Sequence, residues 1–556
     1  MRPPLRILGR FAVLLLALSA AARFDPQGKD TTKMRFVCSE SNDLYSLLAQ
    51  LGKVYPRHGT FAEAIAQASP KSAVLVLADQ YPEKGTVIEE TELDAARSKS
   101  LKVYIEYPQK LPGFELGTPQ KALWERGVVA TDLFGFLLPK HRILDLHSCQ
   151  FVPAQAPQHW LSLGVVAGYD TAVYGIPEKA HPLLFQADKG ALLIATTKLS
   201  NFVTGRYAPS KDWDIFWLRL LMMLSPDDAP ESLEHTPLVR ARWGKNEALP
   251  ENYQKQAFSA AAQWVYDSHL LLSKETKAIN DPLIINNVEW TSAPKPDEPI
   301  GDGRYGILEG YAAVIEPDGS QQRRTPIRAD CHAESAMVLS LGWKMNQSQR
   351  DRDTARNLLN YVYFDSGMHD GVRGDPKNPN FGHIAWGALS HLWEKANYGD
   401  DNARVLLGTM VASACLETDA WDQSMMRALL ANLRTTGPLG FRGGRIDVVP
   451  LETDGWKHYY DAERVHYSPH YESFMWACYL WAYRATGHRE FFDKTKIAIR
   501  MTMEAYPDGW LWQDSLERAR MLLCLSWLVR LEDTPEHREW LHRVADDLLA
   551  YQVSCG

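Results

Sequence analysis

The chain has 556 residues, of which 45% are hydrophobic and 23% are charged, which is the composition of an ordinary globular protein. Its length predicts roughly two to four domains. The formal net charge of -8 and the absence of long basic runs argue against a nucleic-acid partner, because contacts to phosphates need clustered Lys and Arg residues.

Residues 1–22 predict a secretory signal peptide. Arg2, Arg6 and Arg10 form a basic start, residues 11–18 form a short apolar run, and Ala20 to Ala22 form a small-residue cleavage site. The apolar run is shorter than the ~20 residues of a transmembrane helix, and no later stretch is long and apolar enough to span a membrane. We therefore expect export to the periplasm or the extracellular space, with no membrane span.

The seven cysteines are scattered along the chain and do not predict a metal site. None of them is in a Cys-x-x-Cys pair, and the chain contains no His-Glu-x-x-His motif. One disulfide remains possible in an oxidising compartment, but the spacing does not identify it. We expect no metal and no cofactor.

Residues 34–225 alternate short β-rich runs with helical segments, which predicts an α/β domain with a mostly parallel sheet. In such folds ligands bind where strands end, and polar residues lie at the ends of the runs at 73–78 and 191–197, although for each position alone plain turn chemistry is the better explanation. The expected strands are 73–78, 101–107, 128–131, 142–146 and 191–197, and the expected helices are 43–54, 60–67 and 213–224.

The segment Gly190-Ala-Leu-Leu-Ile-Ala-Thr-Thr-Lys-Leu-Ser200, which precedes the last of these helices, resembles the glutamine-amidotransferase-like (flavodoxin-type) domains of some secreted glycosidases. An active amidotransferase would need a Cys between small residues in a sharp strand-to-helix turn. Neither Cys38 nor Cys149 has a neighbouring Gly. We therefore expect this domain to be non-catalytic, with a structural or oligomerising role; the oligomeric state itself is not predicted.

Residues 226–250, which are rich in Pro, Asp and Glu, are the expected linker to an all-α domain at 251–556. Short loops alternate with long ones, at 273–330 and 435–468, which predicts stacked helical hairpins closed into an (α/α)6 toroid. Ten helices are expected, two fewer than the twelve of a toroid, so we expect it to be incomplete at the C-terminus. The helices, identified by apolar residues at helical spacing, are 253–272, 331–344, 353–363, 383–396, 402–416, 423–434, 469–485, 489–504, 515–531 and 535–553.

Several motifs of the all-α domain resemble a group of secreted bacterial (α/α)6 six-hairpin glycosidase-like proteins, over about residue 250 to the end. The resemblance implies a glycoside hydrolase-like protein but no particular substrate. The motifs are Gly301-Asp-Gly-Arg-Tyr-Gly-Ile-Leu-Glu-Gly310, Ile327-Arg-Ala-Asp-Cys-His-Ala-Glu-Ser335, Leu429-Leu-Ala-Asn-Leu-Arg-Thr-Thr-Gly437, Tyr460-Asp-Ala-Glu463 and Ser468-Pro-His-Tyr-Glu-Ser473.

Glycoside hydrolysis generally uses two carboxylates, one of which stays protonated near neutral pH. We favour Asp330 and Asp461, because each lies in a long loop beside rings or histidines, and then Glu309 and Glu463. Two His-x-Glu-Ser motifs, at residues 332–335 and 470–473, begin predicted helices on the same expected rim. Their acidic residues also suit simple helix capping, which is the role we expect for Glu472.

The expected substrate-binding residues lie in the same loops. The arginines could clamp the carboxylate of an acidic sugar, although for each arginine alone a salt bridge to a neighbouring acid is the simpler explanation. The rings and histidines could contact sugar faces. The residues are Arg324, Arg328, Arg464, Trp290, Trp456, Tyr460, Trp510, His332, His466 and His470.

The leading prediction is a secreted glycoside hydrolase that acts on acidic oligosaccharides or polysaccharides with two carboxylates. A polysaccharide lyase of uronate-containing glycans is an alternative, since Tyr460, His466 and Tyr467 with Arg464 could supply a base and a neutralising charge. A non-catalytic glycan-binding or scaffold protein is a third possibility, and an isomerase of a free sugar a fourth.

Overall fold

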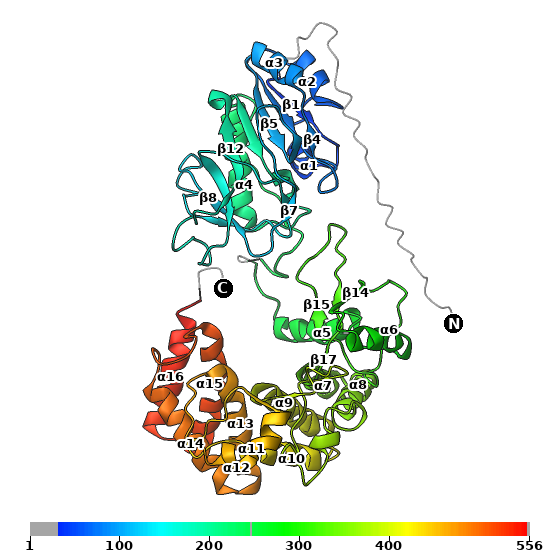
Figure 1. Ribbon diagram of the computed structural model, residues 1–556, viewed down its shortest axis with the longest axis vertical. Helices are drawn as coiled ribbons and strands as arrows, with labels where there is room; N and C mark the ends of the chain where they lie inside the picture. Colours follow the sequence, from blue (N-terminus) through cyan, green and yellow to red (C-terminus); the bar gives the residue numbers. More distant parts are fainter. Residues whose placement is uncertain (1–31, 245–246, 553–556) are drawn as a thin grey trace, which may run out of the picture. The chain divides into compact units, whose positions relative to one another are not determined.

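The computed structural model describes residues 32–244 and 247–552, which belong to two compact units, 1–240 and 241–556 (Figure 1). The predicted signal peptide lies outside the described residues. The boundary between the units falls inside the expected linker at 226–250. The first part of that segment nevertheless packs on the first unit, where Leu233 is buried and Nδ1 of buried His235 lies 2.6 Å from Oδ1 of Asp214.

The first unit contains a nine-stranded mixed sheet in the order β2-β1-β3-β5-β13-β12-β11-β8-β9. The strands from β2 to β13 are parallel, in the 2-1-3-4-5 order of flavodoxin-like folds, and the pairings from β13 to β9 are antiparallel. The expectation of a mostly parallel sheet is therefore corrected, because β11, β12 and β13 follow one another without a crossover helix. The strands are β1 (Met34–Val37), β2 (Arg57–His58), β3 (Ala73–Val76), β5 (Lys102–Glu106), β8 (Arg126–Val129), β9 (Ile143–Leu144), β11 (His159–Gly164), β12 (His181–Ala187) and β13 (Leu192–Ala195).

Helices cover both faces of this sheet. Successive residues of β3 point to opposite faces, so Leu75 packs with α1 and α4, whereas Val74 packs with α2 and α3. The helices are α1 (Asp43–Gln50), α2 (Phe61–Gln67), α3 (Glu90–Ser98) and α4 (Ser210–Leu224). Two small sheets pair β4 (Thr86–Val87) with β6 (Pro108–Lys110) and β7 (Gln120–Lys121) with β10 (Gln150–Phe151), and 3-10 turns lie at Asp188–Gly190 and Leu199–Asn201.

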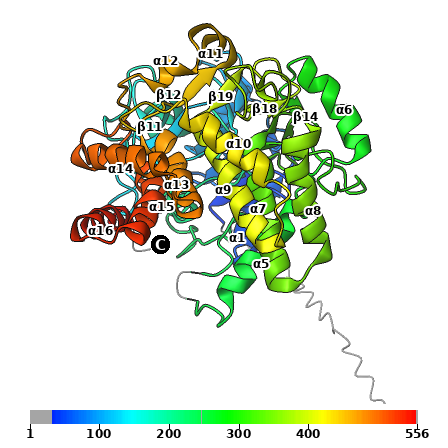
Figure 2. The same ribbon diagram turned by 90° about the horizontal axis from the view of Figure 1, so that it is seen from below.

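The second unit is mainly helical. Helices α7, α9, α13 and α15 form an inner row in which each packs against the next, and α8, α10, α14 and α16 lie outside them (Figure 2). The described part of this unit thus holds four inner–outer hairpins, with α5 packed against α7. The helices are α5 (Tyr253–Asp267), α6 (Lys274–Ile285), α7 (Ala329–Asn346), α8 (Gln349–Asn360), α9 (Gly399–Leu416), α10 (Asp422–Leu433), α11 (Val448–Asp454), α12 (Trp456–Tyr460), α13 (Pro469–Thr486), α14 (Arg489–Glu504), α15 (Ser515–Leu531) and α16 (Pro535–Leu549).

Three segments of the second unit differ from the expectation, one of which is the expected loop 435–468, because it contains α11 and α12. The segment 383–396 is not a helix: it contains β18 and a turn in which the ring of Trp393 packs onto Gly387, where a Cβ atom would lie 2.5 Å from the ring. The expected loop 273–330 contains α6, which begins with a capping box between Ser273 and Thr276. A π-helical turn follows α8 at Tyr361–Asp365, and a 3-10 turn lies at Gly371–Arg373.

Short strand pairs fix the starts of the inner helices. β17 (Ile327–Arg328) pairs with β18 (Gly387–Ala388) and leads directly into α7, and β19 (Ala396–Tyr398) pairs with β20 (Arg445–Asp447) and leads into α9. Gly408 of α9 lies against Ala333 of α7, so the two helices pack closely. Their first turns are therefore held next to each other. A third small sheet contains β14 (Trp290–Thr291), β16 (Arg323–Arg324) and β15 (Gly310–Tyr311).

Within the described residues, none of the helices has the length and the apolar character that a membrane crossing needs.

Candidate functional site

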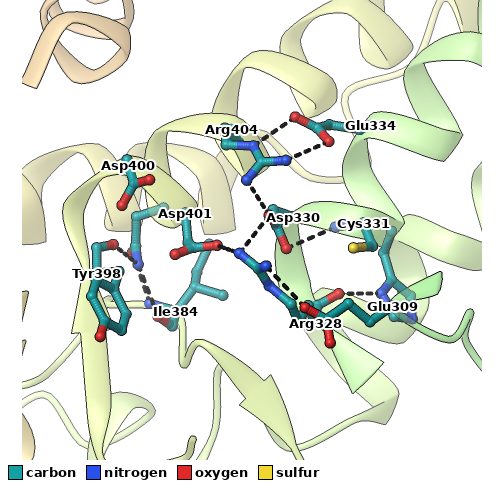
Figure 3. Close-up of polar contacts among 12 residues, drawn as sticks. Glu309, Arg328, Asp330, Cys331, Glu334, Ile384, Tyr398, Asp400, Asp401 and Arg404 are labelled. Atoms are coloured by element: carbon teal, nitrogen blue, oxygen red, sulfur yellow. Dashed lines mark hydrogen bonds and ion pairs between the residues drawn. The ribbon is translucent and has the colours of Figure 1, made fainter. Parts of the chain in front are cut away.

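The candidate site is organised around the guanidinium group of Arg328. This residue ends β17 and is the N-cap of α7. Its Nη2 atom lies 3.0 Å from Oδ2 of Asp330 and 2.6 Å from Oδ1 of Asp401 (Figure 3). Its Nη1 atom lies 3.2 Å from Oε1 of Glu309. One cation therefore holds three carboxylates, which come from three separate segments of the chain.

A second arginine, Arg404 of α9, holds the same cluster. It forms an ion pair with Asp330, and its Nε and Nη2 atoms lie 2.7 and 2.8 Å from the two carboxylate oxygens of Glu334. Asp330 has 0% exposure, and its Oδ1 atom also accepts the backbone N–H of Cys331. Asp330 is thus fully enclosed by its neighbours, and Asp400 and Asp401, with 6% and 4% exposure, are only slightly more accessible.

Asp400 and Asp401 are consecutive residues in the first turn of α9, and they face different neighbours. Successive side chains on an α-helix point about 100° apart. Asp401 points toward Arg328, whereas Oδ2 of Asp400 lies 3.6 Å from Nη1 of Arg520 and 4.0 Å from Nε2 of His470. Oδ1 of Asp400 is buried and has no hydrogen-bond partner within the described ranges.

Burial raises the pKa values of both aspartates. The pKa of Asp401 rises to about 8, first because burial disfavours the charged form and then because Asp330 and Asp400 are negative. The positive charge of Arg328 opposes this shift. Burial also raises the pKa of Asp400, against the opposing charge of Arg520. The raised pKa favours the protonated form of Asp401 beside a second carboxyl group.

Aromatic rings lie beside the cluster. Trp386 and Trp393 are stacked with their centroids 4.1 Å apart, and Tyr398 packs edge-on against Trp386. On the side of α13, the ring of His470 lies 4.6 Å from that of Trp512, which is 44% exposed. Partly exposed rings provide flat apolar surfaces with polar groups at their edges, which suits a ligand that has both apolar faces and hydroxyls.

Asp330, Glu309, Arg324 and Arg328 are predicted residues whose side chains belong to this cluster, and the predicted residue His470 touches it at Asp400. Glu309 lies 3.3 Å from Nε of Arg324 and 3.2 Å from Nη1 of Arg328. Arg324 also pairs with Glu289 at 2.9 Å. Both arginines thus bind carboxylates of the protein itself. Internal salt bridges, rather than a clamp on the carboxylate of a sugar, therefore account for Arg324 and Arg328.

The predicted catalytic residues Asp461 and Glu463 lie outside the cluster. Both are exposed, in the segment between α12 and α13, and neither has a contact with a cluster residue in the described part of the chain. The hydroxyl of their neighbour Tyr460 donates to Glu490 at 2.7 Å, and Nζ of Lys494 lies 3.7 Å from the Tyr460 ring centroid. The structure therefore does not bring Asp461 into contact with Asp330.

His332 and Trp510, which are predicted to bind substrate, are both buried. His332 is fully buried: its Nε2 accepts the N–H of Ile307, and its Nδ1–H donates to the carbonyl of Arg328. Burial lowers its pKa to about 4, so the ring is neutral. Trp510 is 2% exposed and donates to the carbonyl of Thr502. Both side chains therefore make their hydrogen bonds inside the protein.

Arg464 and His466 hold the loop before α13 together with Glu472. The carboxylate of Glu472 accepts the backbone N–H groups of Arg442 and Gly443, and Nδ1 of His466 lies 3.1 Å from it. Arg464 donates to the carbonyl of Arg442. The Glu472 carboxylate thus holds the neighbouring loop at Arg442 and Gly443 rather than only capping its own helix. Together with Arg464 and His466, it stabilises the loop that leads into α13.

Trp290 and Trp456, two further predicted binding residues, are partly exposed. The ring of Trp290 is 38% exposed and lies 5.3 Å from the guanidinium of Arg324. Trp456 packs edge-on against Tyr460, with 5.9 Å between the ring centroids. Trp290 is linked to the cluster through Arg324, whereas Trp456 lies with the exposed segment that carries Asp461.

Asp400, Asp401, Arg404, Arg520 and Trp386 are not among the residues predicted from the sequence. The signal for the two aspartates is present, because they immediately precede the expected helix 402–416. Acidic residues in a first helical turn also stabilise the helix dipole, so this signal does not distinguish a functional pair from a structural one. The two arginines lie inside expected helices and carry no sequence signal.

Thiols and metal ligands do not form a second site among the described residues. Cys38, Cys149, Cys331, Cys415, Cys478 and Cys524 are free. The described ranges also contain no group of three or more His, Cys, Asp or Glu side chains that could hold a metal ion.

No protein-family model matches the chain, and no curated protein matches its sequence. Among solved structures, the chain is distantly similar to the GH76A α-1,6-mannanase of Salegentibacter sp. HEL1_6, with 12% identity and a TM-score of 0.30 over 41% of this chain and 67% of that chain. An inactive variant of that enzyme with two Asp→Asn changes, in complex with α-1,6-mannotriose, gives 13% identity and a TM-score of 0.29 over the same shares. A likeness of this size assigns neither a family nor an activity.

Proposed function

We propose that the second unit is a glycoside hydrolase in which Asp401 is the general acid and Asp400 is the second carboxylate. The observation that carries this proposal is the pair of adjacent aspartates with different partners, one of which has its pKa raised to about 8. Two carboxyl groups in different environments are the pattern by which glycosidases separate acid from base or nucleophile. Arg520 beside Asp400 supports the charged form of that residue.

Asp330 and Arg328 have a supporting role in this proposal. Asp330 is fully buried and stays between two guanidinium groups, so its negative charge raises the pKa of Asp401 without contact with a substrate. Arg328 holds Asp401 in place. Asp330 and Arg328 are therefore positioning residues, and Glu309 joins them as the third partner of Arg328.

The charge balance of the cluster supports a neutral glycan rather than an acidic one. Its four arginines face six carboxylates, and each arginine lies within 4 Å of at least one of them. No cation of the cluster is then left to bind a uronate. The groups are Arg324, Arg328, Arg404 and Arg520 with Glu289, Glu309, Asp330, Glu334, Asp400 and Asp401.

The lyase alternative has less support from the geometry. A lyase needs a base and a neutralising cation at one place on a uronate, and Tyr460, His466 and Tyr467 with Arg464 are the candidates. Tyr460 is bound to Glu490, His466 to Glu472 and Arg464 to a backbone carbonyl. We also propose that the first unit has no amidotransferase activity, because burial raises the pKa of both Cys38 and Cys149 to about 12.

The test is a screen of the full chain on neutral oligosaccharides, with products identified by mass spectrometry. Hydrolysis adds one water per bond cleaved, a lyase product lacks that water, and an isomerase leaves the mass unchanged. We expect Asp401→Asn and Asp400→Asn each to lower kcat/KM by about 10²–10⁴-fold, the usual contribution of such groups. The exposed Asp461→Asn is the matched control and should keep the wild-type rate. Wild-type rates in both cluster variants would overturn the assignment.

A further inference from the structure

The first unit contains a cavity of about 590 Å³ at the carboxyl ends of three neighbouring parallel strands, β2, β1 and β3. Its walls come from residues 37–39 after β1, 58–61 before α2, 76–80 after β3 and 84–92 around β4 and the start of α3. Strands β2 and β3 lie on opposite sides of β1, so the strand order reverses here. In doubly wound sheets, ligands bind in the crevice at such a switch point.

The cavity has an apolar floor and a polar mouth. The floor is formed by buried side chains, namely Phe61, Val76, Leu77, Ala78 and Ile88. The mouth carries hydroxyl, amide and carboxylate groups, namely Ser39, Thr86, Gln80 and Asp79. Such a lining suits a small molecule that has a carbon skeleton and several hydrogen-bonding groups.

The local hydrogen bonds disfavour an anionic ligand. Glu63 caps the N-terminus of α2: its Oε2 atom accepts the N–H groups of Gly59 and Thr60 at 3.1 and 3.2 Å. The start of α3 is closed by Glu92, which accepts the N–H of Glu89 at 2.9 Å. The turn after β1, residues 38–42, contains no glycine. A carboxylate of the protein therefore already lies at each of these two helix starts, where it disfavours a phosphate or another anion.

The charges disfavour a strongly cationic ligand as well. Asp79 accepts the N–H of Ser39 and the amide of Asn42, and Glu89 pairs with Lys110 at 2.6 Å. Lys84 also lines the cavity. These two lysines, with the partial positive charge of about +0.5 at each helix start, offset most of the charge of the carboxylates of Glu63, Asp79, Glu89 and Glu92.

We propose that this cavity binds an uncharged, hydroxyl-rich small molecule of the size of a mono- or disaccharide. Gln80, Ser39 and Asp79 would hydrogen-bond its hydroxyls, and the apolar floor would contact its carbon skeleton. The site lies in the first unit and uses none of the groups assigned to hydrolysis. The proposal of a saccharide site in the first unit is therefore independent of whether the second unit is a hydrolase.

The test is isothermal titration of the full chain with neutral mono- and disaccharides, with ATP and spermidine as charged comparison ligands. The background is the Asp401→Asn variant, so that substrate turnover does not interfere. We expect saturable binding of at least one neutral saccharide and none of the charged ligands. Gln80→Ala should weaken this binding by up to about tenfold, the value of one hydrogen bond. Gln80→Trp, which fills the mouth, should abolish it.

The control is Gln50→Ala, an exposed position on α1 outside the cavity, which should leave the affinity unchanged. Thermal unfolding of each variant verifies that the fold is intact. Three results would overturn the proposal: no binding of any neutral saccharide, tight binding of ATP or spermidine in their place, or saccharide binding that both Gln80 variants leave intact. The last result would locate the saccharide in the second unit, which separates this test from that of the hydrolase.

Discussion

Arg328 is the residue on which the candidate site depends most, because three carboxylates share its guanidinium group. Replacing Arg328 with Gln removes the positive charge that stabilises Asp330, Asp401 and Glu309, although these side chains stay largely shielded from water. We expect Arg328→Gln to lower the free energy of unfolding by about 3–5 kcal/mol, the usual effect of breaking a buried ion pair. Urea denaturation at pH 7 measures this quantity.

The matched control for this variant is Arg445→Gln. Arg445 pairs with Asp447, and their side chains are 44% and 35% exposed, so we expect a loss of about 0–1 kcal/mol. Equal losses in the two variants would contradict the central role of Arg328.

Asp401 couples the stability of the second unit to pH. The pKa of Asp401 is about 8 in the folded chain and ~3.9 in an unfolded one. Between pH ~3.9 and pH 8 the folded state therefore keeps a proton on this side chain that the unfolded state has lost. The resulting stabilisation is complete below pH 4 and is lost as the pH rises through 8. We expect Asp401→Asn, which cannot ionise, to melt at a higher temperature than wild type above pH 8, with the difference shrinking toward pH 4. A melting difference that is constant from pH 4 to 9 would contradict the raised pKa.

At the scale of the elements, the close packing of α7 and α9 sets the distance between the aspartates. A Cβ atom on Gly408 would lie 2.5 Å from the carbonyl oxygen of Ala333, so Gly408→Ala forces the two helices apart. Alanine gains about 1 kcal/mol of helix propensity, but overpacking costs about 1–3 kcal/mol, so we expect net destabilisation and lower activity. Urea denaturation and the hydrolysis assay measure the two effects. Gly374→Ala is the control, since its new Cβ would make only ordinary contacts of 3.4 Å or more.

The sequence predicts helices well where apolar spacing and solvent-facing charges agree. The expected helices 489–504 and 515–531 have the same bounds as α14 and α15. The segment 383–396 has a similar apolar pattern, but its Trp386 and Trp393 stack on each other and its Gly387 pairs with β17. Local periodicity reports neither the ring stacking nor the strand pairing, which depends on residues about 60 positions away.

At the scale of the whole molecule, the candidate site exists only through contacts between distant segments. Arg328, Asp330 and Glu309 are identified from the sequence because they lie in one motif-rich region. Their partners Asp401 and Arg404 lie some 70 residues further along the chain and meet them because α7 packs on α9. Conversely, the density of polar groups around Asp461 is a local property, and it belongs to an exposed segment rather than to the buried cluster.

The division of the chain into two compact units predicts where proteases cut first. Residues 236–250 directly follow His235, whose buried side chain is paired with Asp214 of the first unit. Most of the described residues in 236–250 are exposed, and Val239, for example, has 68% exposure. Exposed, irregular connections are the preferred sites of proteolytic nicking, because cleavage needs the backbone to leave its hydrogen bonds. We expect limited trypsin digestion to cut first after Arg240 or Arg242, which lie in this segment, and to leave two protease-resistant fragments. Mass spectrometry of the digest locates the cuts. Earlier cleavage within α7 to α10 would mean that the second unit is not the stable body described above, and the assignment of its buried aspartate cluster would fail with it.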